Sequence, residues 1–335
     1  MIKHFFTVLL FFIFLNSVFS QDKKFLSPNL TISADYIPGQ QFADFKEKYS
    51  TARANAIFNF PLLSRRFALT NSLEYKTMVI LANAHAGYGL PNFSFIDEQH
   101  QLVNGNAGMS FIYSSGSKNT LVANATVGVA EDLETIKSFQ LRFGGLFILK
   151  HKFNGDFSGL IGAHYSYVYG RGLPLPVLGA IIRAGDKAKF KIILPVNISY
   201  MRKLNQWDML MIFIAPEGGQ NNFCNCGDTV FAGRPDVVRF RSKAFKAGAS
   251  YKIGVNDRIH VTPELGFLTR RNISFSDAGL TAKDSFIKED LKGIVYAKVS
   301  MRILFGDLRF KRTGDNFLLN DERLDDYDLD EVTKL

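Results

Sequence analysis

Cysteine, tryptophan and long apolar segments are all scarce in this chain of 335 residues. It has two cysteines and one tryptophan. Two cysteines cannot supply the disulfide framework that holds small exported domains together. Beyond the first twenty residues, no segment stays apolar for the ~20 residues that a membrane-spanning helix needs. Any passage through a membrane must therefore be made by β-strands.

The first twenty residues, MIKHFFTVLLFFIFLNSVFS, have the layout of a secretory signal peptide. Lys3 precedes an apolar run from Phe5 to Leu15, and Ser20 precedes the expected cut before Gln21. The apolar run is too short for an anchor helix, which needs ~20 residues. No cysteine follows the cut, so a lipid-anchored form is not indicated. The sequence predicts a cleaved signal peptide over residues 1–20 and an exported protein.

The chain also lacks a nucleic-acid-binding module. Its net charge of +9 and pI near 9.4 would suit an anionic partner. However, the basic residues are scattered over strand ends and polar faces, without the arginine-rich or aromatic-studded clustering of nucleic-acid-binding domains. Together with export, this excludes nucleic acid as the expected partner.

Strict alternation of apolar and polar residues is what the chain has in abundance. In FQLRFGGLFILK, Phe143, Phe147 and Leu149 share one side, whereas Arg142 and Lys150 share the other. A period of two is typical of a strand, because successive side chains point to opposite faces of a sheet. Most runs are ~10 residues or longer, which fits tilted strands that cross a bilayer. The predicted strands are 30–36, 51–60, 66–79, 103–113, 120–129, 139–150, 157–169, 189–200, 207–215, 239–253, 259–270 and 295–305. The strand over 239–253 changes phase midway, which indicates a bulge.

Link lengths give a second, independent pattern. Short links at 61–65, 114–119, 151–156, 202–206 and 254–258 alternate with longer ones at 38–48, 81–102, 131–138, 170–188, 217–236 and 271–291. Outer-membrane barrels have short periplasmic turns, long outer loops and an even number of strands. Treating GLPLPVLGAIIRAGD, residues 172–186, as part of a loop gives about twelve strands with both ends on the periplasmic side. We therefore predict a loop there, folded across the mouth or into the lumen.

The same alternation would fit a secreted β-sandwich, whose apolar faces meet in a core. Strand length, the alternation of link lengths and the aromatic residues at run ends favour the barrel. Those aromatics are Tyr113, Tyr169, Tyr200 and Trp207. The predicted fold is all-β, a transmembrane antiparallel β-barrel of about 12 strands over residues 21–305. A charged, acidic periplasmic tail, residues 306–335, follows it.

Two stretches resemble a known family. YIPGQQFADFKEKYSTARANAIFNFPLL, residues 36–63, and GLPLPVLGAIIRAGDKAKFKIILPVNISYMRKL, residues 172–204, resemble an uncharacterised family of outer-membrane β-barrel proteins from Gram-negative bacteria. The motifs are structural, a strand-turn pattern and a proline-containing loop before a long strand. The resemblance implies an outer-membrane location, with the lipid bilayer and the barrel-insertion machinery as partners and Phe305 as the candidate insertion signal. It carries over no activity.

One local pattern suggests catalysis. In AHYSYV, His164 and Ser166 lie two apart on one strand face, as a base and a nucleophile could. The pattern is similar to that of outer-membrane lipid hydrolases. Nothing local supplies a residue to orient the histidine or donors for an oxyanion, and the pair falls on the lumenal side, away from lipid. We expect no enzyme, with lipid hydrolysis through this pair as the alternative.

No metal or cofactor is expected either. Cys224 and Cys226 lie in NNFCNCGD, in a predicted outer loop, where a disulfide staple of the loop or a pairing elsewhere is favoured over a zinc site. The remaining candidates for metal ligands share no ligand spacing. They are His85, His100, His151 and His260.

The polar strand faces carry more basic than acidic residues, so a wet interior should attract anions. The leading prediction is a passive, porin-like channel for small anionic solutes. In one alternative, these charged residues only pair with one another and attract no solute. In another, the barrel does not conduct and acts in surface interaction or as a structural protein. The candidate lumen-lining residues are Arg53, Glu74, Lys76, Arg142, His164, Lys189, Lys191, Glu264, Lys298 and Arg302.

Overall fold

The computed structural model describes ten segments of the chain, residues 28–42, 47–68, 75–96, 99–116, 118–134, 139–167, 172–205, 207–225, 229–277 and 284–305. The predicted signal peptide, the acidic tail, Glu74 and Cys226 lie outside the described residues. Among the described residues, no helix is long and apolar enough to cross a membrane.

Almost all described residues belong to β-strands. Besides one short 3-10 helix, η2 (Thr229–Phe231), the elements are β1 (Asn29–Gln41), β2 (Lys48–Ala68), β3 (Tyr75–Phe93), β4 (Leu102–Ser115), β5 (Asn119–Asp132), β6 (Arg142–Lys152), β7 (Phe157–Ser166), β8 (Leu173–Ala184), β9 (Ala188–Leu194), β10 (Asn197–Lys203), β11 (Met209–Cys224), β12 (Val237–Gly254), β13 (Ile259–Asp277), β14 (Ile287–Leu291) and β15 (Ile294–Leu304).

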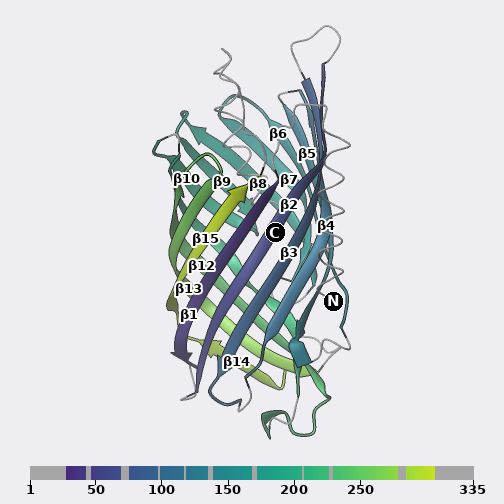
Figure 1. The fold of residues 1–335 in the computed structure, drawn as a ribbon, viewed down its shortest axis with the longest axis vertical. Helices are drawn as coiled ribbons and strands as arrows, with labels where there is room; N and C mark the ends of the chain where they lie inside the picture. The colour runs from purple at the N-terminus through teal and green to yellow at the C-terminus, as the bar shows by residue number, and fades with distance from the viewer. Residues whose placement is uncertain are drawn as a thin grey trace.

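The strands form one antiparallel sheet that closes on itself (Figure 1). Each strand from β1 to β13 pairs with the next, and β1 closes the ring by pairing with β15. β13 pairs along its other edge with β15 and then with β14, so these two short strands share one wall position. The result is a closed barrel with 14 strands in its wall. The even number expected of such barrels is confirmed, but the predicted count of about 12 is too low.

The predicted loop over 172–186 is wrong, because most of this segment is β8, which pairs with β7 and β9. The predicted strand 189–200 is also wrong, since it is the β9–β10 hairpin with a turn at Pro195 and Val196. Ile192 pairs with Ile198 across this hairpin. Cross-strand partners point to the same face, so the alternation passes through the turn without a change of phase and hides it.

Two smaller features also bear on the predictions. The predicted link at 61–65 lies inside β2, and the long links are shorter than expected because strands such as β3 and β13 extend into them. The predicted bulge in 239–253 is confirmed, since the β12–β13 register shifts between Lys243 and Phe245. Cys224 is disulfide-bonded, as the staple hypothesis expected.

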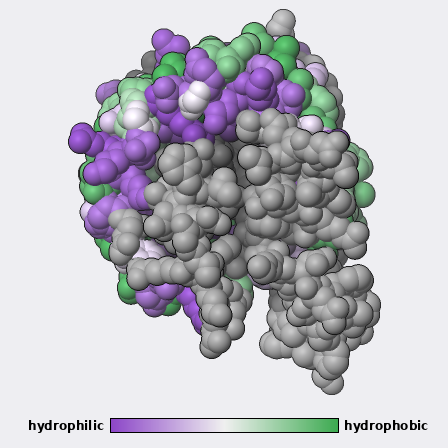
Figure 2. Space-filling model, turned by 90° about the horizontal axis from the view of Figure 1, so that it is seen from above, coloured by the Kyte–Doolittle hydropathy of each residue, from purple (hydrophilic) through white to green (hydrophobic). Residues whose placement is uncertain are grey.

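The outer face of the barrel is apolar. Phe143, Phe147 and Leu149 on β6 are 61%, 52% and 42% exposed, whereas Leu146 and Ile148 between them are buried inside. Because one sheet closes into a ring, these outward side chains meet no second sheet, so the β-sandwich alternative is not formed. Figure 2 looks onto the short-turn end and shows hydrophilic residues over much of the rim, with hydrophobic residues at its margin.

The opposite end of the barrel, where β1, β3, β11 and β13 finish, is filled by apolar side chains instead of polar ones. We call this set the aromatic cluster. Its rings pack at centroid distances such as 5.3 Å between Phe223 and Phe275 and 5.5 Å between Phe93 and Phe240. The cluster comprises Phe42, Tyr49, Phe93, Ile96, Leu102, Phe223, Phe231, Val238, Phe240, Ile273, Phe275 and Leu291. The prediction that apolar faces point outward therefore fails at this end.

Candidate functional site

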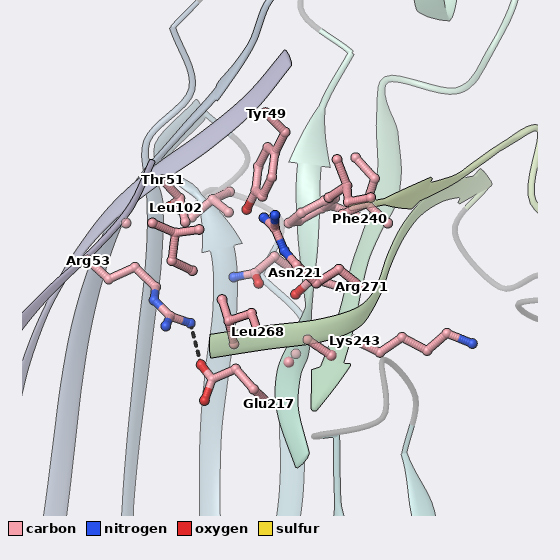
Figure 3. A pocket seen from close by; sticks show the side chains of 18 of the residues that line it. Tyr49, Thr51, Arg53, Leu102, Glu217, Asn221, Phe240, Lys243, Leu268 and Arg271 are labelled. Atoms are coloured by element: carbon pink, nitrogen blue, oxygen red, sulfur yellow. Dashed lines mark ion pairs between the residues drawn. The ribbon is translucent and has the colours of Figure 1, made fainter. Parts of the chain in front are cut away.

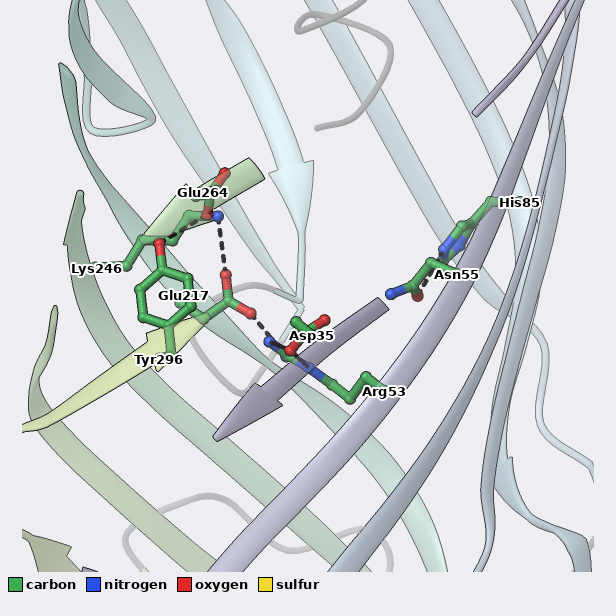
Figure 4. A network of polar contacts seen from close by, with 8 residues as sticks. All are labelled: Asp35, Arg53, Asn55, His85, Glu217, Lys246, Glu264 and Tyr296. Atoms are coloured by element: carbon green, nitrogen blue, oxygen red, sulfur yellow. Dashed lines mark hydrogen bonds and ion pairs between the residues drawn. The ribbon is translucent and has the colours of Figure 1, made fainter. Parts of the chain in front are cut away.

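A network of charged side chains crosses the lumen at mid-height (Figure 4). Asp35 on β1 and Arg53 on β2 are cross-strand partners, and Arg53 Nε donates to Asp35 Oδ2 at 2.7 Å. Arg53 Nη1 lies 2.7 Å from Glu217 Oε1 on β11, on the far side of the barrel. Lys246 Nζ on β12 lies 3.3 Å from the other oxygen of Glu217. Arg53 and Glu217 thus tie opposite walls together.

A second part of this layer lies on β13 and β15. Tyr296 donates its hydroxyl to Glu264 Oε1 at 2.7 Å. Lys298 faces Asp35 on one neighbouring strand and Glu264 on the other. Both carboxylates are already bonded, to Arg53 and Tyr296, and Lys298 has no ion-pair partner among the described residues. Lys298 is therefore a cation that the layer leaves uncommitted.

These groups line a cavity of about 500 Å³ that extends toward the short-turn end. Its wall carries five basic side chains (Arg53, Lys246, Lys252, Lys298 and Arg302) and three acidic ones (Asp35, Glu217 and Glu264), a formal net charge of +2 with histidines neutral. Such a cavity attracts anions, because fixed charges act more strongly in an enclosed space than in bulk water.

The aromatic cluster closes the cavity toward the long-loop end. A smaller pocket of about 170 Å³ lies between the charged layer and the cluster (Figure 3). Tyr49 and Phe240 line it from the cluster, and the guanidinium of Arg271 lies 5.9 Å from the centre of the Tyr49 ring. A solute in the cavity therefore meets packed aromatic rings in this direction, and passage requires them to separate.

The second half of β11 separates from β10 and, still paired with β12, lies against β5. Arg142 donates to the carbonyl of Gln220, and Asn222 Nδ2 donates to Glu131 Oε1 at 3.0 Å. The N–H of Cys224 lies 3.5 Å from Asp132 Oδ2. Polar groups that a neighbouring strand would normally bond are thus satisfied by side chains of the opposite wall.

A buried hydrogen bond between His100 and Asp132 supports the same arrangement of β11. His100 Nδ1 lies 2.5 Å from Asp132 Oδ2, and both side chains are almost fully buried. The His100 ring stacks on Phe223 at 3.8 Å between centroids. The pair thus links the second half of β11 to the aromatic cluster, so the two should open or close together.

The separation of β11 from β10 leaves a gap in the strand pairing on the long-loop side of the β9–β10 hairpin. β9 and β10 have seven residues each, whereas β11 has sixteen. Consequently, among the described residues, no strand pairs with β8 on its β9 side from Leu173 to Val177 or with β11 on its β10 side beyond Ile214.

The structure brings only some of the predicted lumenal residues into the cavity. Lys189 and Lys191 are buried on β9, and Arg142 holds β11 as described. Lys76 lies on the outer face, because Val79, three positions along β3, is buried inside. The prediction had inverted the phase of β3. The predicted residues on the cavity wall are Arg53, His164, Glu264, Lys298 and Arg302.

His164 and Ser166 both line the cavity. The three carboxylates on the same wall are bonded to Arg53, Lys246 or Tyr296, so none is assigned to orient the histidine. Among the described residues there is no cluster of three His, Cys, Asp or Glu side chains that could hold a metal ion.

Sequence reasoning placed Asp35 on the polar strand faces but missed Glu217 and Lys246 as members of the site. Glu217 fell in a predicted loop, and its partner Arg53 is distant in sequence. The motif PEGG at 216–219 was the available signal, because proline and glycine mark the point where a strand leaves a sheet. Gly218 has φ of 151°, which residues with a side chain rarely adopt.

The fold and the site define a closed antiparallel barrel with a cation-rich lumenal cavity sealed at one end. Over residues 16–303 the chain matches the model of a family described as a domain of unknown function, DUF6268, and it belongs to that family. The predicted membership of an uncharacterised family is thereby confirmed. No curated protein sequence matches the chain.

Solved structures with a similar outline are all distant. The COG4313 outer membrane channel from Pseudomonas putida F1 has 8% identity and a TM-score of 0.40, with 86% of this chain and 98% of that chain covered. The Pseudomonas putida toluene transporter TodX has 10% identity and a TM-score of 0.36, covering 87% and 92%. The translocator domain of the autotransporter NalP from Neisseria meningitidis has 8% and 0.35, covering 90% and 96%. Scores in this range do not establish a shared fold, and nothing below rests on them.

Proposed function

We propose that this protein is an outer-membrane β-barrel that admits small anionic solutes to its lumenal cavity. The single observation that carries the proposal is Lys298, a cation without an ion-pair partner among the described residues, in a cavity whose wall has a formal charge of +2. An uncommitted cation in an enclosed space is the group that a passing anion meets first.

The outer surface supports the membrane part of the proposal. Phe143, Ile161, Leu178 and Leu265 come from four different strands and are 57–61% exposed, an apolar belt that water would not favour. The links between β4–β5, β6–β7, β8–β9, β10–β11 and β12–β13 are short, and they lie at the end where β1 begins and β15 ends. Short turns and both strand termini at one end are the arrangement expected on the periplasmic side.

The aromatic cluster sets the resting state of this channel. Because the cluster closes the long-loop end, the conductance along the barrel axis should be low in the resting protein. We expect ions to pass through that end only during brief openings, in which the rings of the aromatic cluster move apart. This gating behaviour distinguishes the proposal from a general diffusion pore.

Reversal potentials in planar bilayers under a potassium chloride gradient test the proposal. The wild-type protein should prefer chloride over potassium, and Lys298→Gln should reduce that preference. Lys187→Gln removes an exposed lysine at the β8–β9 turn and should leave the preference unchanged. A cation-selective wild type, or equal effects of the two variants, would overturn the proposed anion site.

A further inference from the structure

We propose that the gap between β8 and β11 is a side entrance through which a single-chain amphiphile, an acyl chain with one carboxylate, enters the cavity from the membrane. This rests on the proposed function and narrows its anionic solute to one with an apolar tail. The gap lies in the wall and does not depend on the sealed long-loop end.

The rim of the gap lies within the apolar belt of the barrel. The exposed fraction is 58% for Leu178 on β8, and 52% and 40% for Leu194 and Ile198 in the adjoining β9–β10 hairpin. Ile212 and Ile214 on β11 are 50% and 51% exposed. A gap framed by such side chains opens toward hydrocarbon, where apolar chains are concentrated.

The β8 edge of the gap carries no backbone donor. Arg183 N–H donates to the carbonyl of Asp156 on the β7 side at 2.7 Å. Successive residues of a strand point their N–H groups to opposite edges, so the even-numbered positions of β8 face β9. Beyond the end of β9 these positions are Pro174 and Pro176, which have no N–H. An unbonded N–H in hydrocarbon costs several kcal/mol, and prolines avoid that cost.

The β11 edge repeats this device. Leu204 N–H donates to the carbonyl of Asp208 at 3.0 Å, which places the even-numbered groups of β11 on the β10 side. Ile214 is the last of them to find a partner, and the next is Pro216. The polar groups of Gln220 and Cys224 further along this edge are taken by Arg142 and Asp132. The prolines at the two edges, and the side chains that bond Gln220 and Cys224, thus reduce the number of backbone groups that need a partner strand.

The cavity behind the gap is apolar on one side and charged on the other. Leu175 on β8, Val196 in the turn and Pro216 on β11 are rim residues that also line the cavity. Next to them, Met211 and Phe213 line the wall. Lys298 lies across the cavity on β15, and of its charged neighbours only Glu217 lies on β11, where Arg53 and Lys246 bond it. An acyl chain fits the first side and a carboxylate the second.

The size of the cavity selects among amphiphiles. Its volume of about 500 Å³ lies in the range of ~300–1,000 Å³ that small-molecule pockets occupy. This accommodates one medium-length acyl chain with its carboxylate and excludes a whole two-chain phospholipid. The occupant is therefore a free fatty acid or a chemically similar monoanion.

Photo-labelling tests the side entrance. The full-length chain in lipid nanodiscs is irradiated with dodecanoic acid that carries a diazirine at its methyl end, and labelled residues are mapped by mass spectrometry. We expect labels on Met211 and Phe213. Ala215→Trp and Leu175→Trp narrow the entrance from its two edges and should each lower this labelling by roughly tenfold, the effect of about 1.4 kcal/mol. Leu265→Trp adds the same ring to the outer face of β13, away from the gap, and should not lower it.

The controls separate the side entrance from the proposed anion site. Lys298→Gln should weaken labelling by the acid but not by dodecanol with the same diazirine. Labels confined to outer-face residues, or equal effects of the three tryptophan variants, would overturn the side entrance even if chloride selectivity holds. If the wild-type protein showed no chloride selectivity but Met211 and Phe213 were still labelled, only the proposed function would be overturned. Heat-modifiable migration on a gel verifies that each variant is folded.

Discussion

Removing one ring from the aromatic cluster should open the long-loop end. Phe223 is fully buried, and its ring lies 5.3–6.1 Å from those of Phe93, Phe231, Phe240 and Phe275. Replacing a buried phenylalanine by alanine typically costs about 3–5 kcal/mol, from lost burial and the cavity left behind. The ladder that joins β11 to β12 does not depend on this ring, so the barrel should persist.

The size of the effect on the open fraction depends on which state of the channel, closed or open, loses the ring contacts of Phe223. The closed state holds the ring in the cluster, whereas an open state has already separated it, so the substitution destabilises only the closed state. Each ~1.4 kcal/mol changes an equilibrium tenfold. Phe223→Ala should therefore raise the open fraction by roughly two to four powers of ten, until it saturates.

Single-channel recording in planar bilayers measures this directly. Phe223→Ala should convert rare openings into long ones. Phe223→Leu keeps more of the side-chain volume and should increase the open fraction less. Phe147→Ala removes a ring of the same size from the outer face, where it is 52% exposed, and should leave gating unchanged. If Phe223→Ala folds and gates like the wild type, the cluster is not the seal.

Three further substitutions probe the rest of the architecture. Arg53→Met leaves Asp35 without its ion-pair partner and Glu217 with Lys246 alone, and should lower the free energy of unfolding by about 3–5 kcal/mol in urea titrations; an unchanged midpoint would contradict the cross-lumen network. Asp132→Asn should speed hydrogen exchange in the second half of β11, because the His100 contact is lost; unchanged exchange would show that this half of β11 is held otherwise. Phe147→Lys should destabilise the inserted barrel by up to ~2–4 kcal/mol in lipid, and a neutral effect would place β6 outside the membrane.

Part of the site was accessible from the sequence. The alternation that puts Phe147 outside and Arg53 inside is local, because a strand's period of two fixes side-chain direction residue by residue. On that basis Arg53, Glu264, Lys298 and others were predicted to line the lumen, and the structure places them on the cavity wall. Lys76 was misplaced because the link after β2 was predicted about eight residues too early, which carried the wrong phase into β3.

By itself, then, the sequence determined a chain of alternating strands, short turns at one end and a bulge in β12, all of which depend on neighbours in sequence. Only the tertiary structure decided that β9 and β10 are separate, since a two-residue turn preserves the phase. It also decided that Arg53 meets Glu217, and that Phe93, Phe223 and Phe275 seal one end. Those contacts join strands far apart in the chain, and they exist only because the sheet closes and the second half of β11 separates from β10 to lie against the opposite wall.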